Sequence, residues 1–73
     1  MSARKVEAEV TRAEIRKLLS VQRTLLEDAE RRIASGAPGT LVANSLRSLA
    51  CNAADLRELG GDLRGLESDW GVA

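Results

Sequence analysis

A short break at residues 35–40, with the sequence SGAPGT, separates two long segments whose apolar residues recur at helical spacing. Glycine ends helices readily because it adopts left-handed backbone angles, and proline cannot continue a helix but fits the first turn of the next one. Two amphipathic helices on a tight connection form an antiparallel αα-hairpin. The sequence therefore predicts an all-α fold built on one hairpin.

Composition indicates the same fold class and a need for assembly. The 73 residues include eleven leucines and no Phe or Tyr, which is typical of helices and unusual for a small β-domain. We expect a single domain, residues 1–73, that buries only about 60% of its unfolded surface. Cys51 is the only cysteine and histidine is absent, so a disulfide within the chain and histidine-bound zinc are excluded. We therefore expect a homo-oligomer, a dimer or larger, and most simply a four-helix bundle of two hairpins.

The first helix is expected over about residues 3–35. Its apolar stripe spans a wedge of roughly 120°, which is wide enough to face a core. The stripe consists of Ile15, Leu18, Leu19, Gln22, Leu25, Leu26, Ala29 and Ile33, and Ala8 and Thr11 continue it toward the N-terminus. Val6, Val10 and Ala13 share a different face. We interpret that face either as a second surface that a partner buries or as scattered exposed residues.

The second helix is expected over about residues 40–59, after a turn at 36–39. It starts either at Pro38 or after Thr40, which is a candidate N-cap. Its apolar residues alternate spacings of four and three, which predicts a coiled-coil seam between the subunits of an oligomer. That seam consists of Val42, Leu46, Leu49, Ala53 and Leu56.

The Gly60-Gly61 pair interrupts this pattern. Two glycines cost a continuous helix about 2 kcal/mol relative to two alanines. Because Asp62 is a good N-cap residue, we expect a short third helix over about residues 62–68, with a bent but continuous helix as the alternative. Residues 69–73 are expected to form a loose tail.

Four residues are predicted to bind a partner: Val6, Val10, Ala13 and Trp70. Trp70 is the only aromatic residue, and tryptophan is a frequent anchor of protein interfaces; the alternative is that it folds back over the open end of the hairpin. A strip of small residues, Ala43, Ala50 and Ala54, is either a second packing surface or a thin edge against the first helix. A polar patch, Asn44, Ser45, Ser48 and Asn52, is expected to be ordinary polar surface, with contact to a ligand or to a partner's backbone as the alternative.

A row of cations follows the first helix beside its apolar stripe. The row consists of Lys5, Arg12, Arg16 and Arg23. Cations at this spacing suit phosphate contacts, but Glu9, Glu27 and Glu30 lie on or beside the same line, and no aromatic side chain is interleaved for base stacking. The net charge of the chain is zero. A self-paired, solvated face is therefore expected, with nucleic-acid binding or an acidic protein partner as the alternatives.

Catalytic equipment is missing from the sequence. Cys51 has no histidine to act as its base, the acidic residues are too few and too local for a metal cage, and no glycine-rich phosphate loop follows a strand. We expect no enzyme activity, no cofactor, no metal and no small-molecule substrate. The expected function is that of a non-enzymatic protein–protein interaction module, an adaptor, inhibitor or assembly factor, and the alternative is a nucleic-acid-binding regulator.

The cellular setting follows from similar observations. No apolar run of about 18 residues is present, so we expect no membrane span. The N-terminal charges precede no apolar run, so we expect no secretory signal. A lone cysteine suits the cytoplasm. Nine arginines against two lysines indicate a coding sequence rich in G and C, and hence a bacterial or phage source.

Overall fold

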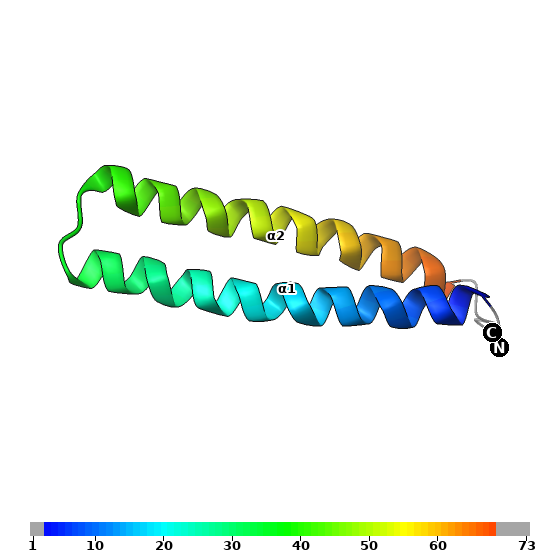
Figure 1. The fold of residues 1–73 in the computed structure, drawn as a ribbon. Coiled ribbons are helices and arrows are strands. Elements are labelled where there is room, and N and C mark those ends of the chain that lie inside the picture. Colours follow the sequence, from blue (N-terminus) through cyan, green and yellow to red (C-terminus); the bar gives the residue numbers. More distant parts are fainter. Residues whose placement is uncertain (1–2, 69–73) are drawn as a thin grey trace.

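The computed structural model describes residues 3–68 and consists of two helices. Helix α1 spans Ala3–Ala34 and helix α2 spans Gly39–Ser68. They lie side by side in opposite directions and form one rod of 53 × 17 × 15 Å (Figure 1). The predicted all-α fold and the antiparallel hairpin are confirmed.

The turn closes α1 by hydrogen bonding of a Schellman type. Gly36 has a φ of +73°, and its N–H donates to the carbonyl of Ile33 at 3.2 Å. The next N–H, that of Ala37, donates to the carbonyl of Arg32 at 2.9 Å. These two bonds satisfy carbonyls that a helix end otherwise leaves unpaired. Gly36 therefore has the helix-ending role that the sequence predicts.

Helix α2 begins at Gly39, between the two predicted starts. The Pro38 carbonyl accepts the N–H groups of Leu41 and Val42 at 3.0 and 3.2 Å, so Pro38 immediately precedes the helix and Thr40 lies inside it. The Arg32 guanidinium donates to the Leu41 carbonyl at 2.8 Å and ties the end of α1 to the start of α2.

The prediction of a short third helix at about residues 62–68 is wrong. Helix α2 continues through Gly60 and Gly61 to Ser68, and its 30 residues nearly match the 32 of α1. The reason is packing on both sides of the glycine pair: Leu59 and Leu63 are both half-buried against α1. This contact outweighs the cost of two glycines in a helix, about 2 kcal/mol.

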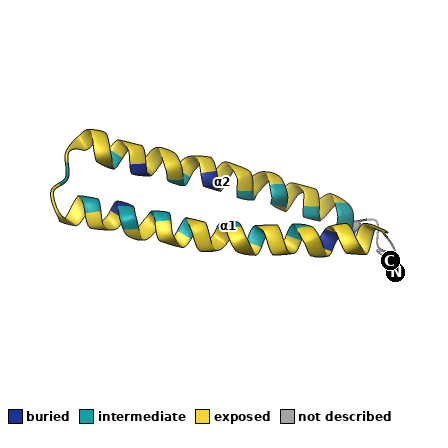
Figure 2. Ribbon diagram, in the orientation of Figure 1, coloured by how far each residue is buried: buried dark blue, intermediate teal, exposed yellow. Residues whose placement is uncertain are grey.

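The two helices meet along one seam, which the burial colours follow in Figure 2. Its members are buried or half-buried and recur at alternating spacings of three and four residues, as in a coiled coil. On α1 they are Ala8, Thr11, Ile15, Leu18, Gln22, Leu25, Ala29 and Arg32. On α2 they are Val42, Ser45, Leu49, Asn52, Leu56, Leu59, Leu63 and Leu66.

This seam is not a closed core. Within residues 3–68, only Ala8 and Ala29 are buried apolar residues, and no large side chain is fully buried. The radius of gyration is 16.6 Å, whereas a compact domain of this length has about 11 Å. The hairpin therefore leaves its large seam residues partly exposed to solvent or to a partner.

Neither described helix has an apolar stretch long enough to cross a membrane.

Candidate interaction surface

Two polar contacts cross the seam and set the register of the helices. The Asn52 amide donates to Gln22 Oε1 at 2.6 Å and to the Leu18 carbonyl at 3.1 Å. About two turns closer to the connection, Ser45 Oγ donates to Asp28 Oδ2 at 3.1 Å. Because a slip of either helix would break both contacts and bury their polar groups unpaired, these residues specify which levels of α1 and α2 face one another.

Asp28 also joins the second contact to two arginines of its own helix. Its Oδ2 lies 3.4 Å from Arg32 Nε, and its Oδ1 lies 3.5 Å from a terminal nitrogen of Arg31. Since Arg32 also bonds the Leu41 carbonyl, a connected polar network closes the turn end of the seam.

The residues of the oligomer seam predicted on α2 divide between two faces of the helix in this single hairpin. Val42, Leu49 and Leu56 lie between the helices, but Leu46 and Ala53 are exposed, and Ser45 and Asn52 are buried at the adjacent positions. The prediction that Ser45 and Asn52 are ordinary polar surface is therefore wrong. They are buried because each finds a hydrogen-bond partner on α1.

The wide stripe expected on α1 divides into two parts in the structure. Ile15, Leu18 and Leu25 face α2, while Leu19, Leu26 and Ile33 are at least half exposed. The three exposed residues are spaced by seven, so they form one line along the helix. This line lies one residue beyond the seam.

An ion pair shows that the exposed lines of the two helices share one side of the hairpin. Arg12 lies seven residues before Leu19, and Glu67 lies two heptads after Ala53. Arg12 and Glu67 form a salt bridge. The line through Leu19 and the line through Ala53 therefore flank the same side of the seam.

We call this surface the apolar strip. It consists of Leu19, Leu26, Ile33, Leu46 and Ala53, and its four large side chains are 50–61% exposed. The two cross-helix contacts, Asp28 with Ser45 and Gln22 with Asn52, set the levels at which the helices face each other. At these levels Leu26 lies close to Leu46. Leu19 likewise lies close to the level of Ala53. Two further exposed alanines, Ala43 and Ala50, edge the strip on α2.

Toward the open end, the same side of the hairpin becomes basic. The helical spacing continues the strip into five cations and two carboxylates: Lys5, Arg12, Arg16, Arg57, Arg64, Glu9 and Glu67. Arg12 is held by Glu67. One side of the molecule thus has an apolar half near the turn and a basic half near the termini.

The opposite side of the hairpin is acidic. A groove of about 280 Å³ there is lined by Glu14, Asp55, Glu58 and Asp62 over the seam residues Leu18 and Leu59. No group of three or more carboxylate or thiol side chains within residues 3–68 has the arrangement of a metal site. The two sides therefore differ in charge as well as in polarity.

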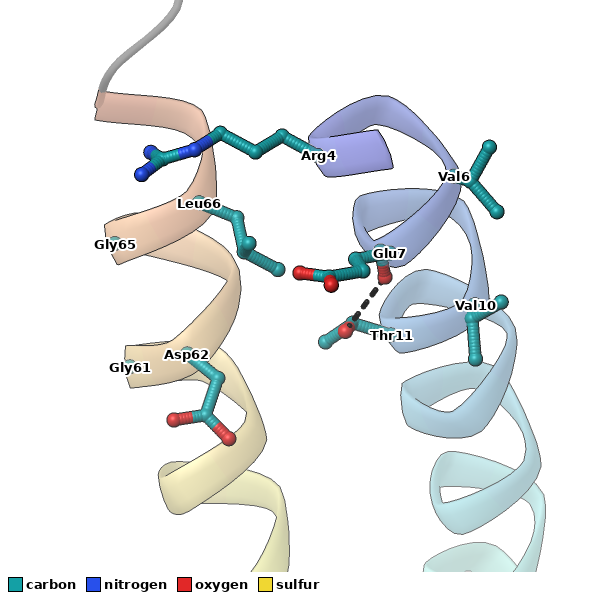
Figure 3. A pocket seen from close by; sticks show the side chains of 9 residues that line it. All are labelled: Arg4, Val6, Glu7, Val10, Thr11, Gly61, Asp62, Gly65 and Leu66. Carbon is teal, nitrogen blue, oxygen red and sulfur yellow. Dashed lines mark hydrogen bonds between the residues drawn. The ribbon is translucent and has the colours of Figure 1, made fainter. Parts of the chain in front are cut away.

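The residues in the first turns of α1 that were predicted to bind a partner do not belong to the apolar strip. Figure 3 shows Val6 and Val10 pointing away from α2, at the rim of a groove of about 740 Å³ at the open end, while Glu7 and Thr11 point toward α2. Val6, Val10 and Ala13 are exposed but share no side with the apolar strip. Trp70 lies outside the described residues.

The predicted cation row follows the strip side of α1, but one of its members is already engaged in an ion pair and is not available for phosphate contacts. Arg12 is paired with Glu67 across the helices, and Arg16 and Arg23 are exposed. The structure thus brings part of the row beside the apolar strip. Cys51 is exposed on α2.

Sequence reasoning missed the strip as a surface because it assigned Leu19, Leu26 and Ile33 to the core stripe. The available signal was their common spacing of seven, one residue out of phase with Leu18 and Leu25. No protein-family model, curated protein or solved structure matches this chain.

Proposed function

We propose that this chain is a small non-enzymatic protein–protein interaction module that acts as an oligomer through its apolar strip. The observation that carries the proposal is the strip itself: four large aliphatic side chains, Leu19, Leu26, Ile33 and Leu46, are at least half exposed on one side of a hairpin. Contiguous exposed apolar surface of this kind marks interaction sites in soluble proteins. Such a module serves as an adaptor, an inhibitor or an assembly factor.

The free energy gained by burying the strip is comparable with the cost of association. Fully burying a leucine or isoleucine contributes about 1.5–3 kcal/mol, so covering the exposed half of each contributes about 1 kcal/mol. Two strips packed on each other would therefore gain roughly 8 kcal/mol from eight side chains. That is comparable with the cost of association, about 4–15 kcal/mol, so the alanines and charges around the strip decide the affinity.

Partner binding would also close the core of the hairpin. The seam residues form a single layer between two helices, and a second pair of helices on the strip would cover one side of that layer. The same association therefore stabilises the fold and creates the interface.

Sedimentation equilibrium on two variants tests the proposal. The variant Leu26→Glu/Leu46→Glu puts charges into the strip, and we expect it to be monomeric at concentrations where the wild-type chain has at least twice the monomer mass. The control Val21→Glu/Leu41→Glu changes two residues that are 41% and 42% exposed on the opposite side, and we expect it to keep the wild-type mass. A helical wild-type monomer at several hundred micromolar would contradict the proposed function.

A further inference from the structure

We propose that a second copy of this chain covers the apolar strip, with the two hairpins face to face and their turns at opposite ends. In this arrangement α1 lies against the partner's α1, and Leu26 lies beside the partner's Leu26. This inference rests on the proposed function and adds the geometry of the interface.

A two-fold symmetric pair of hairpins has two ways to join its strips. With both turns at one end, α1 packs on the partner's α2 at the same level. With the turns at opposite ends, α1 packs on the partner's α1, and α2 on the partner's α2. All neighbouring helices are antiparallel in both arrangements, so only the side chains distinguish them.

The spacing of the residues in the strip favours the arrangement with the turns at opposite ends. Leu19 and Ile33 lie seven residues on either side of Leu26, so a two-fold axis at Leu26 sets Leu19 against the partner's Ile33. On α2 the same axis passes near Leu46. Large side chains then meet along the whole interface on the α1 side. With both turns at one end, Leu19 would instead meet Ala53.

The charges beside the strip have the same symmetry. Arg23 and Glu30 lie three residues before and four residues after Leu26 on its outer edge, and both are exposed. They are too far apart along α1 to pair with each other. The axis at Leu26 brings Arg23 next to the partner's Glu30, and Glu30 next to the partner's Arg23, so each copy completes the other's ion pair.

The arginines of the basic half disfavour the other arrangement. Arg16 and Arg57 lie at nearly the same level on α1 and α2, within the cation-rich half near the open end. With both turns at one end, Arg16 would face the partner's Arg57, and the two basic halves would oppose each other. With the turns at opposite ends, each basic half extends past the partner's turn, so this repulsion is avoided.

The exposed area of the hairpin leaves room for such a partner. The chain has 5439 Å² of accessible surface, whereas a compact protein of 7.8 kDa has about 4,400 Å². The excess of about 1,000 Å² is comparable with the area that each partner buries in a standard interface, about 800 Å². A partner hairpin on the apolar strip would therefore remove part of this excess.

Cysteine cross-linking tests the geometry. In a Cys51→Ser background, the variant Leu26→Cys is oxidised with copper phenanthroline after its dimer mass has been checked. We expect a disulfide dimer, because the two Cβ atoms meet at the axis. A mixture of the single variants Leu26→Cys and Leu46→Cys is the control. If oxidation links only the mixed pair, the turns lie at one end and the inference is wrong, while the proposed function stands.

A charge swap gives an independent readout. We expect Arg23→Glu and Glu30→Arg each to raise the dimer dissociation constant about tenfold, since two ion pairs become repulsive. The double variant Arg23→Glu/Glu30→Arg should recover the wild-type value, because the swap restores both contacts. Additive losses would overturn the inference. A monomeric wild-type chain would overturn the proposed function as well.

Discussion

Asn52 of α2 reaches across the seam to Gln22 of α1, with 2.6 Å between the Asn52 amide nitrogen and Gln22 Oε1. The same nitrogen also donates to the Leu18 carbonyl. A single polar layer among leucines reduces the stability of a coiled coil but specifies its register. This layer therefore explains why two helices with many leucines each settle in one alignment.

Replacing Asn52 by alanine removes this contact and leaves a half-buried glutamine oxygen unpaired. We expect Asn52→Ala to lower the free energy of unfolding by about 1–2 kcal/mol, measured by urea denaturation followed by circular dichroism. Asn44→Ala is the matched control, since Asn44 is exposed on the same helix, and it should change the free energy by less than about 0.5 kcal/mol. Equal effects of the two variants would show that the cross-helix bond contributes nothing.

Asp28 and Ser45 should be energetically coupled. Their hydrogen bond spans the seam at 3.1 Å, so the double variant Asp28→Ala/Ser45→Ala should lose less stability than the two single variants together. We expect a coupling free energy of about 1 kcal/mol from the double-mutant cycle. Asp28→Ala alone should cost more than Ser45→Ala, because it also removes the contacts with Arg31 and Arg32. Strict additivity would contradict the contact.

Gly36 should be intolerant of a side chain. Its φ of +73° lies in the left-handed region, where an L-residue costs about 1–2 kcal/mol. We therefore expect Gly36→Ala to lower the thermal midpoint by several degrees, measured by circular dichroism. Gly39→Ala, at the start of α2 and without a positive φ, is the control and should not lower the midpoint. A neutral Gly36→Ala would mean that the turn has another backbone conformation.

Gly60 and Gly61 should behave in the opposite way. A Cβ added at either position meets nothing within 4 Å, and alanine is more favourable than glycine in a helix by about 1 kcal/mol per residue. We expect Gly60→Ala/Gly61→Ala to raise the free energy of unfolding by about 2 kcal/mol, as measured by urea denaturation. A loss of stability would indicate that α2 breaks at this pair in solution.

The nucleic-acid alternative predicts a response to salt. If Arg16 and Arg23 contacted phosphates, affinity for mixed DNA would fall steeply with salt, and Arg16→Gln/Arg23→Gln would reduce the slope by about two. We expect no electrophoretic shift at low salt, because Arg12 is engaged by Glu67 and Glu30 lies on the same edge. A salt-dependent shift that the double variant weakens would instead support nucleic-acid binding.

Local chemistry in the sequence was enough to predict the hairpin. The 3.6-residue periodicity of α1, the helix end at Gly36 and the position of Pro38 immediately before α2 depend only on neighbours within a few residues. These interactions act within one turn, so residue type and spacing determine them. The all-α class and the position of the turn therefore followed without knowledge of tertiary contacts.

Tertiary structure decided which face of α2 packs against α1, and it also decided that α2 continues through its glycine pair. Leu46 and Ser45 are adjacent, and hydrophobicity alone favours burying Leu46; Ser45 is buried because Asp28 on the other helix accepts its hydrogen bond. Likewise, the helical cost of Gly60 and Gly61 is local, but the packing of Leu59 and Leu63 that offsets it comes from α1. The sequence determined which residues could pack, whereas the partner helix decided which of them did, because burial and hydrogen bonding are properties of pairs.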